Sequence, residues 1–191
     1  MKYGFMQKMM WTGYKGTFRK QLTETFSESD PNAVMKAAHK KYKEILADVT
    51  EFEKGDRFLV NILSCAMLSA VLLSVEKKYS VEEVRVYYRK AMCENFLTKA
   101  ASKKSKAYTE KGRVKLKEQA KKSESNENPY SWKFSVEDGD TINRYTAYFH
   151  TCGICYLMTK LGLEEYTPAM CTLDYDMAAM KKTTFTPEYT L

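Results

Sequence analysis

The stretch from Phe58 to Val75 contains no charged residue and is apolar over roughly the length of a membrane span. Asn61 and several serines interrupt it, and charged residues flank it closely on both sides. These features favour a helix buried in the centre of a folded protein over a transmembrane helix. We therefore expect amphipathic elements to pack around this helix, and we expect no membrane partner.

Helical spacing dominates residues 1–122. Large apolar side chains recur every three or four residues from Phe5 to Phe26, which predicts a first helix. Asp30 followed by Pro31 is a start signal for the next helix, because aspartate caps free amide groups and proline suits the first helical position.

A second start signal lies at Ser80 and Glu83, where a hydroxyl and a carboxylate can each satisfy the other's backbone amide. It predicts a helix that carries Phe96, followed by a polar helical stretch. Lysine and arginine outnumber acidic residues between Lys99 and Lys122, and the chain has a net charge of +7. No nucleic-acid-binding motif accompanies this charge, so we interpret it as a solvated helix face and expect no nucleic-acid partner.

From Trp132 onward the apolar spacing changes from helical to alternating. Residues 138–140 are Asp-Gly-Asp, a turn signal, so a hairpin with a second strand over residues 141–151 is expected. A helix over residues 152–161 should follow. Alternation returns over residues 183–191, which predicts a third strand.

These patterns predict one α+β domain over residues 1–191. A helical half, residues 1–122, is expected to pack on residues 130–191, which form a small antiparallel sheet with an inserted helix. A chain of 191 residues with 44% hydrophobic residues can bury a core of its own. The N-terminus lacks the layout of a secretory signal, so a cytoplasmic location with reduced thiols is expected.

The five cysteines form no regular disulfide framework. Cys65 and Cys93 fall on the apolar faces of expected helices, and we interpret them as core residues. The other three lie near the C-terminal end. Their arrangement therefore carries most of the chemical information in the sequence.

Five residues converge in one short region: His150, Cys152, Cys155, Cys171 and Asp174. Cys152 and Cys155 are three apart at an expected strand-to-helix junction, where the helix N-terminus favours a thiolate. This arrangement fits a nucleophilic or ligand-binding thiol, but also inert buried cysteines or a Cys152–Cys155 redox disulfide. A zinc site that adds Cys171 and either His150 or Asp174 is a further alternative. The residues alone leave these four interpretations open.

The same region resembles the signature of the L-2-amino-thiazoline-4-carboxylic acid hydrolase family. The resemblance rests on the run Cys152-x2-Cys155-x6-Gly162-x-Glu164-Glu165-x2-Pro168-x2-Cys171-x2-Asp174. The alternating strand from Trp132 and the segment from Phe185 to Leu191 are also similar to family elements, and the region around Ser80 looks like its helical half. Family members usually continue into a Gly-rich turn and a Cys-Asp-Phe-like segment, so the resemblance implies a shortened or missing element here.

The resemblance implies a hydrolase that opens a small cyclic amidine-like ring by adding water at the carbon between sulfur and nitrogen. Cys152 or Cys171 would be the nucleophile or a substrate contact. Asp174 would orient a partner or act as a base, and Glu165 is a second acid–base candidate. Arg144 could pair with the substrate carboxylate. Three further side chains are expected to contact the substrate: Tyr148, His150 and Cys155.

The implied reaction requires no cofactor, and zinc stays an open alternative. The family is also similar in fold to vinyl-reductase-like and haem-nitric-oxide-sensor domains. This likeness supports an alternative function as a non-catalytic module that binds or senses a small molecule. The Met- and Tyr-rich segment from Met1 to Phe18 contains Trp11 and is apolar for an exposed terminus. We expect it to be a possible homodimer contact.

Overall fold

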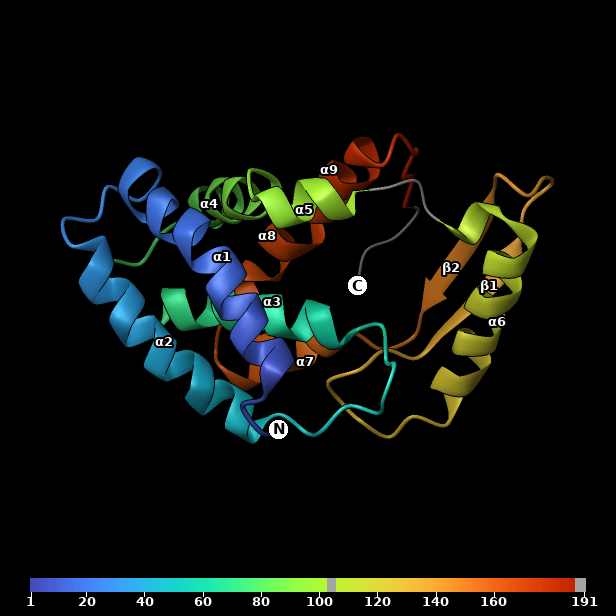
Figure 1. Cartoon of the computed structure of the whole chain (residues 1–191), viewed down its shortest axis with the longest axis horizontal. Helices are drawn as coiled ribbons and strands as arrows, with labels where there is room; N and C mark the ends of the chain where they lie inside the picture. The colour runs from blue at the N-terminus through green and yellow to red at the C-terminus, as the bar shows by residue number, and fades with distance from the viewer. Residues whose placement is uncertain (103–105, 188–191) are drawn as a thin grey trace.

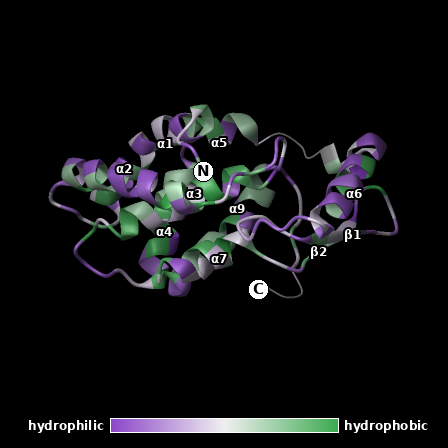
Figure 2. Cartoon of the chain, turned by 90° about the horizontal axis from the view of Figure 1, so that it is seen from below, coloured by the Kyte–Doolittle hydropathy of each residue, from purple (hydrophilic) through white to green (hydrophobic). Residues whose placement is uncertain are grey.

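The computed structural model describes residues 1–102 and 106–187, and the uncharged stretch forms helix α3 (Leu59–Leu72). Every residue from 62 to 71 is buried. Helices α1, α2 and α7 pack against α3, which lies in the middle of the helical part and is apolar along most of its length (Figures 1 and 2). The prediction of a central buried helix is confirmed, and the described part of the chain contains no helix long and apolar enough to cross a membrane.

The other N-terminal helices begin at the expected caps. They are α1 (Phe5–Glu24), α2 (Pro31–Asp48) and α4 (Val81–Cys93). The Asp30 carboxylate accepts hydrogen bonds from the amides of Asn32 (3.1 Å) and Ala33 (2.9 Å) at the start of α2. The Ser80 amide donates to the Glu83 carboxylate (2.8 Å), and the Glu83 amide donates to the Ser80 hydroxyl (3.3 Å). Both start signals are therefore confirmed.

The polar stretch after α4 forms several short elements, whereas a single helical stretch was expected. It contains α5 (Phe96–Ala101), the 3-10 turn η1 (Lys106–Tyr108) and α6 (Glu110–Glu124). Two side chains start new helices within it: Asn95 accepts from the amide of Leu97 (2.9 Å), and Thr109 accepts from that of Gly112 (3.2 Å). Such caps compete with continuation of the preceding helix, which explains why the prediction was wrong.

The C-terminal part forms a hairpin followed by short helices. Its elements are β1 (Phe134–Asp138), β2 (Tyr145–Phe149), α7 (Gly153–Lys160), η2 (Glu164–Tyr166), α8 (Thr167–Cys171) and α9 (Leu173–Met180). The strands are antiparallel, with Phe134 opposite Phe149 and Asp138 opposite Tyr145. The α+β class is confirmed, with a sheet smaller than expected.

The expected third strand is wrong where the structure describes it. Residues 183–187 form no strand, and residues 188–191 lie outside the described residues. Lys182 takes a left-handed conformation (φ 54°) after α9. This turn lets the amide of Thr183 donate to the carbonyl of Ala178 (3.0 Å), which ends the helix and turns the chain.

The helical half (residues 1–122) and the C-terminal half (residues 130–191) do not pack as two separate units. Helix α6 packs on β1, while α7 packs on α3 and α8 packs on α4. Figure 1 accordingly shows α6 and the hairpin at one end of the molecule and α7–α9 among the N-terminal helices. The inserted helix therefore belongs to the main helical core, and the hairpin has a helix of its own.

The large apolar side chains of the N-terminal helix α1 are mostly buried against the rest of the chain. Met10, Trp11 and Phe18 are buried, whereas Phe5 is 77% exposed and Met9 is 46% exposed. The homodimer contact stays a prediction, and these two exposed side chains are the apolar groups that remain to form it.

Arg113 holds α6 and the hairpin together. Its buried guanidinium donates to the Asp138 carboxylate (2.7 Å) and to the backbone carbonyls of Ile142 (2.9 Å) and Ala107 (3.2 Å). The Arg113 Cζ atom also lies 4.6 Å from the centre of the Tyr145 ring. One side chain thus connects η1, α6, β1 and the hairpin turn.

Replacing Arg113 with alanine should lower the free energy of unfolding by about 2–3 kcal/mol, because it strands two carbonyl groups and removes a buried cation. Lys117→Ala is the matched control, since Lys117 also pairs with Asp138 but is exposed. That change should cost less than about 1 kcal/mol. Denaturant unfolding of both variants would measure the difference, and equal losses would contradict the assigned role of Arg113.

Candidate functional site

The first turn of α7 presents two thiols. Cys152 is the N-cap residue with extended backbone, and Cys155 lies in the first turn. Gly153 between them packs directly on the backbone of Tyr130, where an added Cβ would overlap the carbonyl group and lie 3.0 Å from Cα. The glycine therefore allows this helix start to sit close against the segment that leads into the hairpin.

Four cysteines meet around this turn. Cys65 of α3 and Cys171 at the end of α8 lie close enough to Cys152 to interact with it electrostatically, and Cys65 also interacts with Cys155. Cys65 is fully buried, whereas the other three are partly exposed. We call this group the cysteine cluster. It forms because α7 packs on α3 and on α8.

Burial raises the pKa values of three thiols in the cluster. Burial, followed by the neighbouring Cys152, raises the pKa of Cys155 to about 12. Burial also raises the pKa of Cys171 and, further still, that of Cys65. Cys155 lies close enough to Cys152 for the two thiols to interact.

Asp174 in the first turn of α9 joins the cluster. It interacts electrostatically with Cys171 and with the buried Tyr88 of α4, whose hydroxyl is hydrogen-bonded to Ser64. Asp174 is accessible to solvent, yet enough protein surrounds its carboxyl group for desolvation to raise its pKa, against a smaller lowering by Lys181. A carboxyl group with a raised pKa can exchange protons nearer neutral pH than an ordinary one.

Four other expected site residues make their polar contacts elsewhere. Arg144 is 75% exposed at the hairpin turn, 3.7 Å from Asp140 and at the opposite end of β2 from α7. Glu165 forms an ion pair with Lys78 (2.8 Å). The remaining pairs join the two strands or their ends: Tyr148 with Glu137 (3.2 Å), and His150 with Ser135 (3.1 Å).

The cluster does not have the arrangement of a metal site. Among the described residues, no three histidine, cysteine, aspartate or glutamate side chains are placed to hold one ion together. His150 bonds to Ser135 of the hairpin. The zinc alternative needs four ligands around one ion, and the described residues do not fit it.

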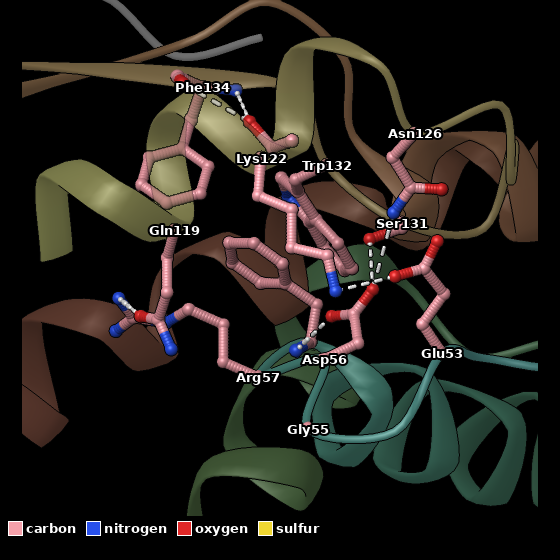
Figure 3. A pocket seen from close by; sticks show the side chains of 12 residues that line it. Glu53, Gly55, Asp56, Arg57, Gln119, Lys122, Asn126, Ser131, Trp132 and Phe134 are labelled. Carbon is pink, nitrogen blue, oxygen red and sulfur yellow. Dashed lines mark hydrogen bonds and ion pairs between the residues drawn. The ribbon is translucent and has the colours of Figure 1, made fainter. Parts of the chain in front are cut away.

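A separate pocket lies between the start of α3, α6 and the segment before β1. Its lining includes Arg57, Trp132 and Phe134. Figure 3 shows its polar groups directed at one another: Asp56 accepts from Ser131 (2.7 Å), and Lys122 pairs with Glu53 (2.6 Å). These groups connect α6 to the helical part, and none of the expected site residues lines the pocket. We therefore place the candidate site at the cysteine cluster, where several reactive groups meet.

The sequence interpretation brought out Cys152, Cys155, Cys171 and Asp174 but missed Cys65 and Tyr88 as members of the same group. Cys65 was expected to fill the core, and its complete burial confirms that. Its position beside the other thiols depends on how α7 packs on α3, and no local signal along the chain encodes that contact.

Comparison with known proteins identifies a family. Neither the curated proteins nor the solved structures gave a match. The family model described as L-2-amino-thiazoline-4-carboxylic acid hydrolase matches residues 60–191, which include all of α3 but its first residue, the hairpin and the whole cysteine cluster. This match covers well over half of the chain and agrees with the resemblance of its cysteine motif. The chain belongs to the L-2-amino-thiazoline-4-carboxylic acid hydrolase family.

Proposed function

We propose that this protein hydrolyses a small cyclic amidine-like substrate of the 2-amino-thiazoline-4-carboxylate type, with Cys152 as nucleophile. The observation that carries the proposal is the cysteine cluster. In it, the partly exposed thiol of Cys152 at the N-cap of α7 lies near Cys171, and Cys171 lies near the carboxyl group of Asp174. Family membership supports the reaction class. The position of Cys152 at the N-terminus of α7 supports its role, because free amides and the helix dipole stabilise a thiolate there.

The proposed reaction consumes one water. The Cys152 sulfur adds to the ring carbon between sulfur and nitrogen, and the electron pair of the C=N bond takes up a proton at nitrogen. The bond from this carbon to the ring sulfur then breaks, and that sulfur leaves as a thiol. Water attacks the same carbon and expels Cys152, which yields N-carbamoyl cysteine and restores the enzyme.

Asp174 is the proposed general base for the water. Its carboxyl group is accessible, lies near Cys171, and has a raised pKa. Cys171 then lies on the side of the site that faces Asp174.

Asp174→Asn tests the role of the base. Ring opening should fall by about 10²–10⁴-fold, because the amide cannot accept the proton. The base form is absent below the pKa of Asp174, so activity of the unaltered protein should rise with pH through a value above the ordinary 3.8. Product formation followed by mass spectrometry across pH would show this limb, and the variant should lose it.

Asp176→Asn is the matched control, since Asp176 lies on the same helix and binds Arg89 (2.8 Å) of α4. It should keep both the rate and the pH limb. Equal losses in the two variants would contradict the role of Asp174. A folded, unaltered protein that opens no 2-amino-thiazoline-4-carboxylate would contradict the proposed substrate and favour a binding or sensory module.

A further inference from the structure

Cys152 and Cys155 have the layout of a dithiol that can close. Side chains three apart at a helix start lie roughly 5–6 Å apart at Cβ, and a disulfide needs roughly 3.5–4.5 Å. Cys152 is the extended N-cap residue, so its side chain is not fixed by helical geometry and can approach. Cys155 lies close enough to Cys152 for the two thiols to interact.

The surroundings of the pair favour reaction between these two thiols. Both are partly exposed, so a small molecule can reach them, whereas Cys65 is fully buried. Cys93 lies on α4 apart from the cluster, and its charged neighbours are Asp176, Arg89 and Glu94. Cys171 is the one other partly exposed thiol of the cluster, and it belongs to a different helix.

We propose that Cys152 and Cys155 form a reversible disulfide by exchange with a low-molecular-weight disulfide, and that this bond switches off the candidate site. Closure of the disulfide removes the nucleophilic sulfur of Cys152. The effect on activity rests on the proposed function, whereas formation of the bond does not.

The exchange is balanced in two steps. The Cys152 thiolate attacks one sulfur of oxidised glutathione, which forms a mixed disulfide and releases one glutathione thiolate. Cys155 then loses its proton to that thiolate and attacks the Cys152 sulfur, which releases the second glutathione as a thiolate that takes up the proton Cys152 had given to the solvent. The protein dithiol is oxidised to a disulfide, and one glutathione disulfide is reduced to two thiols.

Tryptic digestion places the proposed pair in one peptide and each other cysteine in a different one. Trypsin cleaves after Arg144 and Lys160, so Cys152 and Cys155 fall in one peptide, residues 145–160. The other cysteines fall in separate peptides, which cover residues 58–77, 91–99 and 161–181. Oxidation of the proposed pair therefore leaves peptide 145–160 two hydrogen atoms lighter and without alkylation, while the other peptides stay alkylated.

The experiment incubates the full chain with mixtures of reduced and oxidised glutathione, alkylates free thiols and digests with trypsin. The closed form of peptide 145–160 should rise as the share of oxidised glutathione rises, and it should disappear on return to reduced glutathione. Cys155→Ser should stop at a glutathione adduct on Cys152, because the second thiol is missing. Cys93→Ser should oxidise like the unaltered chain.

Two results would overturn the disulfide: peptide 145–160 stays alkylated at every ratio, or it becomes linked to peptide 161–181 through Cys171. Ring opening measured on the same samples should fall in proportion to the oxidised fraction and return on reduction. A closed disulfide with unchanged hydrolysis would overturn the switch. Absence of hydrolysis from the fully reduced chain would instead contradict the proposed function and leave the mass measurement valid.

Discussion

Cys152→Ala should reduce ring opening of 2-amino-thiazoline-4-carboxylate by about 10³-fold or more, because it removes the atom that forms the first bond with the substrate. The loss should appear in kcat, since the remaining cluster still offers a surface for the substrate. Cys152 is at the N-cap of α7 with no side-chain capping bond, so alanine should leave the helix intact. Product measured by mass spectrometry, with circular dichroism to confirm folding, would test this.

Cys93→Ala is the matched control, because Cys93 is partly buried but its charged neighbours are Arg89, Glu94 and Asp176, outside the cluster. It should keep nearly full turnover. Turnover retained by a folded Cys152→Ala protein would remove the thiol from the mechanism and leave direct attack by water, with Asp174 as base. Loss in both variants would show that the assay reports general damage to the fold.

Gly153→Ala should lower the free energy of unfolding by about 3 kcal/mol, at the upper end of the cost of overpacking. The added Cβ would overlap the Tyr130 carbonyl, and backbone cannot move away as a flexible side chain can. The start of α7 would have to shift, which should also move Cys152 and reduce activity. Chemical denaturation would give the stability change.

Gly16→Ala is the control for this prediction. Gly16 lies in α1, where an added Cβ meets nothing within 4 Å. Alanine should therefore stabilise the protein by up to about 1 kcal/mol, because it restricts the unfolded chain and favours the helix. If Gly153→Ala were as stable as the unaltered protein, the close approach of α7 to Tyr130 would be wrong.

Local signals predicted much of the fold. The caps at Asp30 and Ser80 and the uncharged stretch of α3 all act within a few residues. The breaks at Asn95 and Thr109 were local too, but each depends on competition between a cap and the helix before it. Helical spacing alone does not decide such a competition.

The sequence predicted those site residues that lie within one helix turn of each other. Cys152 with Cys155, and Cys171 with Asp174, are pairs three residues apart, and both pairs belong to the cluster. Arg144 was expected on the strand that leads to the site, but it lies at the far end of β2 beside Asp140. A strand extends about 3.3 Å per residue, so nearness in sequence places a side chain well away in space.

The sequence by itself determined the starts of α1, α2, α3, α4 and α7, the alternating hairpin, and the thiols at the start of α7, because these depend on contacts within a few residues. Only the tertiary structure decided that α6 joins the hairpin, that α7 packs on α3, and that Cys65 and Tyr88 belong beside the reactive group. These outcomes come from burying apolar faces against one another. Burial is nearly non-directional, so a hydrophobic pattern specifies which face is buried but not which partner covers it.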